Sequence, residues 1–294
     1  MLSDDIVITG NRAMARSYAK INLTLDVLKK RADNYHDVEM IMQTVSLYDL
    51  VLVDKMKSGI TISTNLRFLP NNDKNIAYMA AKKFFDYTGL NAGCKIMIHK
   101  NIPVAAGLAG GSGNAAAVLC SLNLLYNTAL SVDELCSIGL QLGADVPYCI
   151  LGGTYLAEGI GEKLTPLPDM ADCTILMVKP SINISTASIY DAIDNEEISS
   201  RPDTQAMICA LENRDINMIA ANLSNVMGVI TGKLHPIVRG IRKKMLLNGA
   251  LGAQMSGSGP TVFGIFPDYE TAKKAHDSFV YQFKDVFIVR PYKR

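Results

Sequence analysis

A glycine-rich run in the first half of the chain has the composition of an anion-binding loop. Four glycines fall within the seven residues Gly107–Gly113, and an alanine-rich segment of helical character follows. Glycine leaves backbone N–H groups uncovered and permits positive φ angles, and the N-terminus of a helix adds a positive dipole end. A tight turn between a strand and a helix has the same composition. The run by itself therefore does not separate a polyphosphate cradle from a turn.

Two other phosphate-binding motifs are excluded. The segment Gly228–Lys233 has three residues between its glycines, and Leu234 follows the lysine. The P-loop needs four intervening residues and a Ser or Thr after the lysine. No G-x-G-x-x-G follows a strand and opens a βαβ unit, which argues against a dinucleotide-binding fold.

An alternating segment places a cation and an amide on one side of a strand. Apolar and small residues alternate with polar ones over residues 15–27, which predicts a strand with one buried face. Lys20 and Asn22 share the polar face, with side chains about 6–7 Å apart along the strand. They suit a polar substrate group, although the pattern alone favours a solvated outer face.

An acidic residue follows a helix stop at Leu142–Pro147. Asp145 stands between Gly143 and Pro147, where a carboxylate can cap the next helix. The same carboxylate near a lysine would stay ionised and act as a general base toward a hydroxyl. Both readings stay open on the residues alone.

A run of small residues near the end, Met255–Pro260, precedes a predicted strand. Small side chains let a second backbone segment approach a ligand closely. A flexible turn into the strand is the alternative interpretation.

The composition is that of a globular protein. The chain has 294 residues, 49% apolar and 19% charged, with a formal net charge of +1. It therefore lacks the basic excess of a nucleic-acid binder. The six cysteines, at 94, 120, 136, 149, 173 and 209, include no C-x-x-C pair and are expected to be reduced thiols of a cytosolic protein. The acidic start predicts no secretory signal, and no apolar stretch reaches the roughly 18 residues of a membrane span.

Strands and helices mix without a strict βα repeat, which predicts an α+β fold. Strands are expected at 15–27, 38–53, 60–63, 95–99, 154–157, 174–178 and 286–290, and a loop followed by a strand at 254–266. Helices are expected at 75–87, 114–126, 132–142, 186–193, 204–212, 216–223, 235–247 and 269–283. The third of these is predicted from a capping box at Ser131–Glu134. A domain division near residue 158 is expected, giving units 1–158 and 159–294.

Three of these segments together resemble the motifs of the GHMP kinases, the superfamily of galactose, homoserine, mevalonate and phosphomevalonate kinases. They are Ala19–Leu23, Pro103–Ala116 and Ser256–Gly259, in the order that the superfamily has them. The resemblance implies two domains, an N-terminal one like ribosomal protein S5 and a C-terminal ferredoxin-like one. It also implies ATP and Mg²⁺ as cofactors.

The likeness is most specific to the branch of that superfamily that phosphorylates the 2-hydroxyl of 4-diphosphocytidyl-2-C-methyl-D-erythritol in the non-mevalonate isoprenoid route. Lys30–His36 is similar to its R-x-D-G-Y-H, Leu142–Pro147 matches its L-G-A-D-V-P, and Gly152–Gly153 with Gly159–Leu164 match its G-G and G-x-G-E-x-L. The resemblance implies a small-molecule substrate, no nucleic-acid or membrane partner, a monomer or weak homodimer, and a cytoplasmic location.

The resemblance also implies roles for individual residues. Lys20 and Asp145 correspond to the catalytic pair, with Asp145 taking the hydroxyl proton. The residues implied to bind substrate are Asn22, Tyr35, His36, Lys100, Thr186 and Tyr190. The residues implied to cradle the ATP phosphates are Pro103, Val104, Ala105, Ala106, Gly107, Leu108, Ala109, Gly110, Gly111, Ser112 and Gly113.

The chain departs from the family pattern at two functional segments. Asn34 replaces the usual glycine before Tyr35, and Asn tolerates the left-handed backbone better than most residues. The loop usually reads G-G-L-G-G-G-S-S, whereas here Ala109 and Gly113 replace a glycine and the second serine. A loop serine helps to hold Mg²⁺ in related kinases, so the metal ligands stay unassigned.

Two other functions remain as alternatives. Another GHMP kinase, acting on mevalonate or homoserine, would share the three motifs, but Tyr35, His36 and Leu142–Pro147 argue against it. A catalytically silent binding protein on the same fold would explain Ala109 and Gly113, but the intact Lys20 and Asp145 oppose it.

Overall fold

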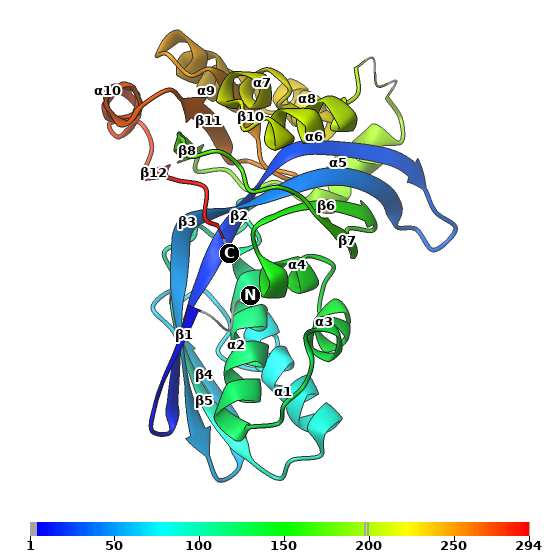
Figure 1. The fold of residues 1–294 in the computed structure, drawn as a ribbon, viewed down its shortest axis with the longest axis vertical. Helices are drawn as coiled ribbons and strands as arrows, with labels where there is room; N and C mark the ends of the chain where they lie inside the picture. Colours follow the sequence, from blue (N-terminus) through cyan, green and yellow to red (C-terminus); the bar gives the residue numbers. More distant parts are fainter. Residues whose placement is uncertain (1–4, 197, 199, 294) are drawn as a thin grey trace.

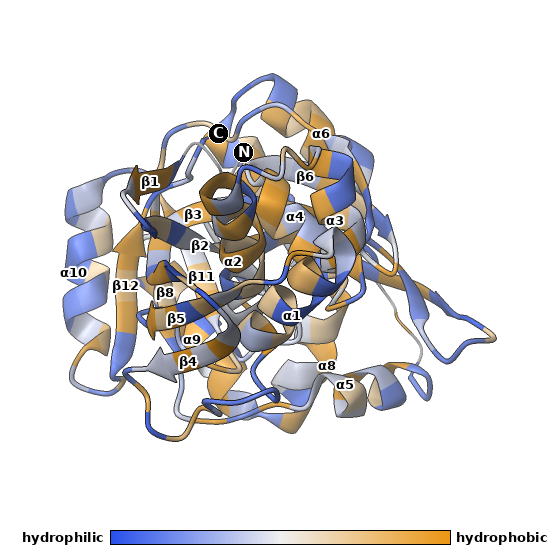
Figure 2. Cartoon of the chain, turned by 90° about the horizontal axis from the view of Figure 1, so that it is seen from below, coloured by the Kyte–Doolittle hydropathy of each residue, from blue (hydrophilic) through white to orange (hydrophobic). Residues whose placement is uncertain are grey.

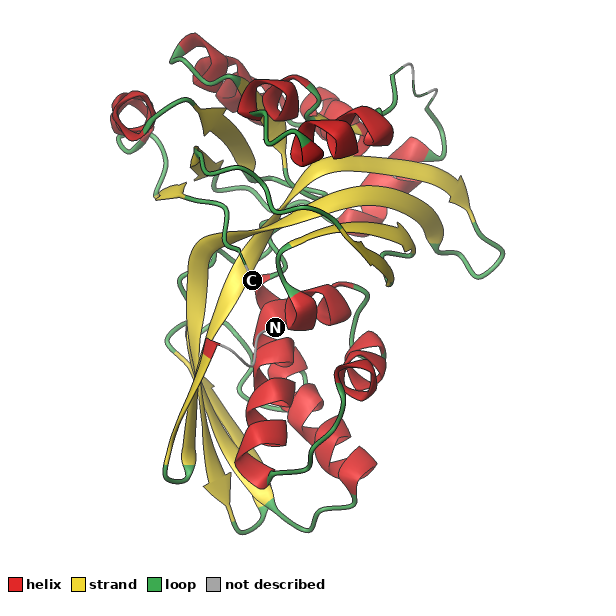
Figure 3. Cartoon of the chain, in the orientation of Figure 1, coloured by secondary structure: helices red, strands yellow, loops and turns green. Residues whose placement is uncertain are grey.

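The computed structural model describes residues 5–196, 198 and 200–293, and it contains two β-sheets with helices packed against them (Figures 1 and 3). The first sheet has the order β1-β2-β3-β5-β4, with β6 and β9 joining β3 and β2, and β7 joining β6. Its strands are β1 (Ile6–Thr9), β2 (Arg12–Lys30), β3 (His36–Met56), β4 (Gly59–Thr64), β5 (Gly93–His99), β6 (Thr154–Gly159), β7 (Lys163–Pro166) and β9 (Ser224–Asn225).

Four helices cover one face of the lower part of this sheet (Figure 3). They are α1 (Ile76–Thr88), α2 (Gly110–Tyr126), α3 (Val132–Leu140) and α4 (Asp145–Leu151). Ser131 and Glu134 form the capping box that the sequence predicts for α3. The alanines of α2 are buried, which lets this helix lie close to β2 and β3.

The second sheet is antiparallel, in the order β10-β11-β8-β12. Its strands are β8 (Thr174–Lys179), β10 (Gly252–Met255), β11 (Val262–Phe266) and β12 (Asp285–Val289). The second-half helices are α5 (Thr186–Ile193), α6 (Thr204–Glu212), α7 (Ile216–Ala221), α8 (Val226–Leu234), α9 (Pro236–Leu247) and α10 (Tyr269–Phe279). The strand order and the helical crossings are those of a ferredoxin-like domain, so the α+β expectation is confirmed. Figure 2 shows the mostly hydrophilic α10 outside the apolar β12.

Strand β2 corrects the expectation of one buried face. From Ser17 to Val27 every residue is buried, on both sides of the strand, and the second half of the chain packs on the apolar side at Ala19, Ile21 and Leu23. Register shifts against β3 after Tyr18 and after Asn22 change which core the odd-numbered residues enter. The polar face that carries Lys20 is therefore enclosed by protein.

Most predicted elements are present, with ends shifted by a few residues. Helix α2 begins at Gly110 and not at residue 114, because glycines fit a first helical turn whose N–H groups have no intrahelical partner. The segments β1, β7, β9, β10 and α8 were not predicted; Gly228 and Gly232 hide the helical pattern of α8. Strand β7 pairs within the first sheet as far as Pro166, beyond the expected division near 158. Among the described helices, none is both long and apolar enough to cross a membrane.

Candidate active site

The glycine-rich loop forms the wall of a cavity of about 390 Å³. Its consecutive residues Pro103–Gly111 line this cavity, and α2 begins within them. Ala105, Gly107 and Ala109 have positive φ angles of 51°, 74° and 54°. The loop therefore turns repeatedly and ends at a helix N-terminus, which is an arrangement that binds phosphate groups.

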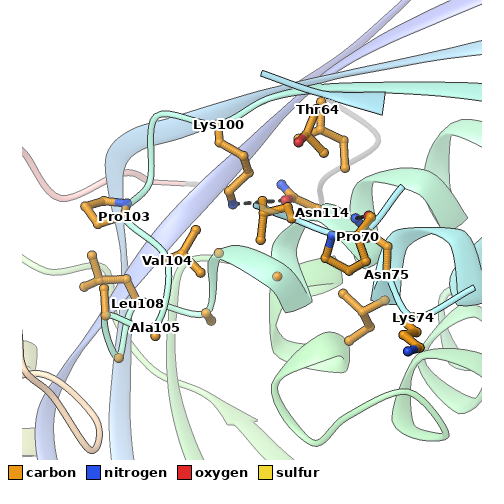
Figure 4. Close-up of a pocket in the computed structure, with 18 residues that line it drawn as sticks. Thr64, Pro70, Lys74, Asn75, Lys100, Pro103, Val104, Ala105, Leu108 and Asn114 are labelled. Atoms are coloured by element: carbon orange, nitrogen blue, oxygen red, sulfur yellow. Dashed lines mark hydrogen bonds between the residues drawn. The ribbon is translucent and has the colours of Figure 1, made fainter. Parts of the chain in front are cut away.

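The far side of this cavity is formed by the segment that leads into α1. Asn75 caps α1 through a 3.0 Å hydrogen bond from the N–H of Ala77, which fixes the wall of the cavity at the start of the helix. The remaining lining residues, drawn in Figure 4, are Thr64, Leu69, Pro70, Lys74, Asn75, Ile76, Ile98, Lys100 and Asn114. The apolar side chains among them, Leu69, Pro70, Ile76 and Ile98, suit a nucleotide base. In the sequence, the one local signal for this wall is Asn75, a residue type that commonly caps a helix.

Lys20 and Asp145 line one common cavity of about 300 Å³. Ala105, Gly107 and Ala109 line this cavity as well as the first. The glycine-rich loop Pro103–Gly111, called the phosphate loop below, therefore separates the two cavities. Within the part of the chain that the structure describes, the ammonium and the carboxylate form no ion pair with each other. The space between them can therefore hold a reacting group.

The Lys20 side chain is held from several directions. It is only 5% exposed, and its Nζ donates a 2.6 Å hydrogen bond to Asn22 Oδ1. The backbone N–H of Lys20 donates to the carbonyl oxygen of Leu108 at 3.2 Å, which attaches β2 to the phosphate loop. Asn22 Nδ2 in turn contacts Met40 Sδ at 3.2 Å. These contacts restrict the position of the ammonium group.

Asp145 is the first residue of α4, and Ala144 occupies the N-cap position. Asp145 thus belongs to the first turn and is not the N-cap residue, and it lines the cavity. Burial, with a smaller effect of the Asp145 charge, raises the pKa of Tyr190 to about 12. Tyr190 therefore keeps its hydroxyl proton at neutral pH.

The loop that precedes β11 closes the cavity opposite Asp145. Ser256 Oγ donates a 2.9 Å hydrogen bond to the carbonyl oxygen of Gly107. A Cβ on Gly107 would lie 2.2 Å from the carbonyl oxygen of Ser256, so only glycine permits this approach. A Cβ on Gly257 would lie 3.5 Å from Lys20 Nζ. The small-residue run of the sequence thus reaches both the phosphate loop and the lysine.

Helix α5 supplies another wall through Thr186 and Tyr190. Thr186 Oγ1 lies 2.8 Å from Ser258 Oγ, across the mouth of the cavity. His36 stacks on Tyr190 with ring centroids 4.5 Å apart and an interplanar angle of 14°. His36 does not itself line this cavity among the described residues; it faces the adjoining hollow, where its Nε2 lies 2.7 Å from Asp194 Oδ1.

Tyr35 lies in the turn between β2 and β3 and is 60% exposed. Figure 1 shows this turn projecting from the body of the molecule. Asn34 beside it has φ 65°, so the asparagine adopts the left-handed backbone of the glycine that the family pattern has there.

Lys100 lies in the nucleotide-sized cavity and not beside Tyr190, which departs from the substrate role that the resemblance implied. The reason is a buried cluster beside the cavity, of which Figure 4 shows Lys100 and Asn114. Lys100 Nζ forms an ion pair with Asp49 and a 3.0 Å hydrogen bond to Asn114 Oδ1. Asp49 is fully buried and also accepts N–H bonds from Asn101 and Ile102.

The last two expected loop residues, Ser112 and Gly113, fall in the first turn of α2 and are not among the described residues lining either cavity. A Cβ on Gly113 would lie 2.6 Å from Ser17 Oγ. Ser17 Oγ accepts a hydrogen bond from Asn114 Nδ2 at 3.2 Å, which fixes it there. Ser17 Oγ therefore occupies the space that the side chain of the usual second serine would need at position 113.

Two family models match the chain: the GHMP kinases N terminal domain over residues 75–153 and the GHMP kinases C terminal domain over residues 207–285. The 4-diphosphocytidyl-2-C-methyl-D-erythritol kinase of Clostridium novyi (strain NT) is 48% identical over 275 residues, 94% of this chain and 98% of that protein. The kinase of the same name from Alkaliphilus metalliredigens (strain QYMF) is 48% identical over 280 residues, 95% of this chain and 96% of that protein.

Solved structures agree with these matches. A crystal structure of 4-(cytidine 5'-diphospho)-2C-methyl-D-erythritol kinase superposes with a TM-score of 0.82 at 29% identity and covers 95% of this chain and 99% of that one. A homoserine kinase from Cytophaga hutchinsonii has a TM-score of 0.72 at 18% identity, covering 98% of this chain and 96% of that one, and supports the fold alone.

The phosphate loop, the paired domains and the family models define the class, and the chain belongs to the GHMP kinases. Within that superfamily, its place is in the family of 4-diphosphocytidyl-2-C-methyl-D-erythritol kinases.

Proposed function

We propose that this chain transfers the γ-phosphoryl group of ATP to the 2-hydroxyl of 4-diphosphocytidyl-2-C-methyl-D-erythritol, with Lys20 and Asp145 at the point of transfer. One observation carries the proposal. The two side chains line a single cavity that shares Ala105, Gly107 and Ala109 with the nucleotide-sized cavity. A terminal phosphate lying on the phosphate loop would therefore reach the space between the ammonium and the carboxylate.

The nucleotide would occupy the larger cavity. Its base would lie against the apolar wall near Leu69 and Ile98, and its phosphates along Pro103–Gly111. Uncovered N–H groups and the N-terminus of α2 supply positive charge along this path. Lys100, on the same side, adds a cation that Asp49 holds in place.

The reaction then needs one proton acceptor and one source of positive charge. Asp145 takes the proton of the 2-hydroxyl while the oxygen of that hydroxyl forms a bond to the γ-phosphorus, and the bond from that phosphorus to the departing ADP oxygen breaks. The Lys20 ammonium stabilises the negative charge on the transferring group. Most of the rate enhancement in such a transfer comes from positioning and charge stabilisation.

The donor groups near the loop fit a Mg²⁺ ion that binds together with ATP. Mg²⁺ takes one or two protein oxygens plus phosphate oxygens and water. Asp145 is an oxygen-bearing side chain that lines the smaller cavity beside the loop, whereas Ser112 lines neither cavity among the described residues. No three His, Cys, Asp or Glu side chains cluster as a metal site in the described ranges. The ion would neutralise phosphate charge.

The cytidyl end of the substrate would extend from the reacting hydroxyl toward α5. Thr186 and Tyr190 line the cavity there, and His36 lies behind the Tyr190 ring. An aromatic face suits a pyrimidine ring, and Tyr35 on the projecting turn can fold over it. We place the reaction in the cytoplasm, where ATP is available, in the non-mevalonate route to isoprenoids.

A coupled assay of ADP release tests the proposal. The purified chain with Mg²⁺ and ATP is given the cytidyl substrate, mevalonate or homoserine in parallel reactions. We expect turnover of the cytidyl compound, with ³¹P NMR locating the new phosphate on the 2-hydroxyl. Turnover of mevalonate alone would overturn the substrate assignment, and no turnover of any alcohol would favour a binding protein.

A further inference from the structure

The side chain of Asn225 is buried, and both its oxygen and its nitrogen form hydrogen bonds within the protein. One of its partners, Gly257, lines the cavity that Lys20 and Asp145 share, called the catalytic cavity below. Asn225 is 2% exposed and lies in β9, where it pairs with Leu25 of β2. Its Oδ1 accepts the N–H of Gly228 at 3.3 Å and caps α8. Its Nδ2 donates to the carbonyl oxygens of Met255 and Gly257 at 2.8 and 2.9 Å. One amide thus joins the catalytic strand, a helix and the loop before β11.

The loop that it holds is a tight turn. Gly259 N–H donates to the Ser256 carbonyl at 2.9 Å, and Gly257 has φ 56°, a backbone conformation natural to glycine. The peptide between Gly257 and Ser258 is therefore the central peptide of the turn. Its carbonyl direction is set by Asn225.

The trans geometry of that peptide fixes where its N–H points. Carbonyl and N–H groups of a trans peptide face opposite ways. The Gly257 carbonyl points to the buried Asn225, so the Ser258 N–H points away from it, on the side where Gly257 and Ser258 line the catalytic cavity. Among the residues that the structure describes, this N–H has no hydrogen-bond partner. It is a free donor close to Lys20, which lies against Gly257.

We propose that Asn225 is a positioning residue for phosphoryl transfer, which holds the Gly257 carbonyl so that the Ser258 N–H binds a phosphate oxygen beside Lys20. The inference rests on the proposed function. Two phosphate groups can supply the oxygen: the γ-phosphoryl group in transfer, or the diphosphate of the cytidyl substrate. A preoriented backbone donor suits either, because it gains a charge-assisted hydrogen bond without reorganisation.

The variant Asn225→Asp tests this with little change of shape. A carboxylate keeps the oxygen that caps α8 but cannot donate to either carbonyl, and its charge repels both. We expect kcat/KM for the cytidyl substrate to fall by about 10²-fold, while KM for ATP changes by less than about threefold. A loss in kcat assigns the donor to the transferring phosphoryl group, and a raised KM for the cytidyl substrate assigns it to the diphosphate.

Asn123→Asp is the matched control. Asn123 donates through Nδ2 to the Leu130 carbonyl at 3.0 Å, after the end of α2, and it lines neither cavity among the described residues. This variant should lower the melting temperature and leave kcat and KM unchanged. The same pattern in Asn225→Asp, stability lost with unchanged kinetics, would mean a structural role and overturn the proposal.

A measurement on the unmodified chain covers the case in which Asn225→Asp does not fold. In ¹⁵N-labelled protein, the Ser258 amide proton should shift and exchange more slowly when the cytidyl substrate and a non-hydrolysable ATP analogue are both bound. An unchanged Ser258 resonance would overturn the inference. Failure of the unmodified chain to use the cytidyl substrate would count instead against the proposed function.

Discussion

Ser256 Oγ donates a 2.9 Å hydrogen bond to the carbonyl oxygen of Gly107, so the second half of the chain holds the phosphate loop from behind. Ser256 is fully buried, and its backbone N–H donates to Thr261 at 2.9 Å. The position of the phosphate loop thus depends on both halves of the protein.

Replacing Ser256 with alanine should therefore affect both stability and nucleotide binding. The loss of one buried hydrogen bond should lower the free energy of unfolding by about 1 kcal/mol, and the released loop should raise KM for ATP several-fold. Urea unfolding and steady-state kinetics measure the two effects. Ser137→Ala removes a 2.8 Å bond to the Asp133 carbonyl on exposed α3 and should leave KM unchanged. An unaltered KM for ATP in Ser256→Ala would contradict the coupling.

Asp145→Asn should separate binding from turnover. The amide keeps the shape of the cavity but cannot take the hydroxyl proton, so kcat should fall by about 10³-fold. The dissociation constant for ATP should stay close to that of the unmodified chain in calorimetry. Asp86→Asn, on the exposed face of α1, is the matched control and should have normal turnover. Normal turnover in Asp145→Asn would remove the carboxylate from the mechanism.

Gly113→Ser restores the usual loop serine and should be destabilising, because its Cβ would lie 2.6 Å from Ser17 Oγ. Such overpacking costs about 1–3 kcal/mol in the free energy of unfolding. Adding Ser17→Ala removes the obstructing oxygen, so the same substitution should then cost less. Denaturant unfolding of the four proteins gives the interaction energy, which should exceed about 0.5 kcal/mol. Additive effects would show that the two positions do not compete for space.

We expect the stability difference between the unmodified chain and Asp194→Asn to depend on pH. Hydrogen bonds from Lys30 and His36 hold the pKa of the Asp194 carboxyl below its ordinary value of 3.8. A carboxyl with a lowered pKa in the folded state stabilises the protein above its unfolded pKa, and this contribution is lost as the pH falls through the folded value. The difference in unfolding free energy between the unmodified chain and Asp194→Asn should therefore be constant at neutral pH and shrink below about pH 4.

Chemical denaturation at a series of pH values measures that difference. Asp86→Asn, which replaces an exposed aspartate that has no ion-pair partner among the described residues, should show no comparable loss at low pH. A difference for Asp194→Asn that grew on acidification would contradict the assigned direction of the pKa shift.

Local sequence signals accounted for much of the secondary structure. The capping box at Ser131 and Glu134 located the start of α3, and alternation located β2. Helix α8 was not predicted, because Gly228 and Gly232 interrupt its helical pattern, although Asn225 is a favourable N-cap residue. The short strands β7 and β9 have too few residues for any periodicity to show.

The candidate site was predictable in part. The resemblance of short motifs to those of the GHMP kinases named Lys20, Asp145 and the loop, and the structure places them around two adjoining cavities. Lys100 was expected at the substrate, but its partner Asp49 lies on the neighbouring strand β3, far away in the sequence, and holds it in the wall of the nucleotide-sized cavity. The role of Asn225 has no local signature at all, because its two carbonyl partners come from another part of the chain.

From the amino-acid order alone came the mixed architecture, because it follows from helical and strand periods. The class of reaction and the groups expected to perform the chemistry came from the resemblance of short motifs to those of the GHMP kinases. The enclosure of Lys20, its common cavity with Asp145 and the closing of that cavity by Gly257 came from the folded chain. Such relationships arise when β-bulges and long-range packing bring together segments that are distant in the sequence. The register of that packing depends on both partners, so it cannot be predicted from either segment alone.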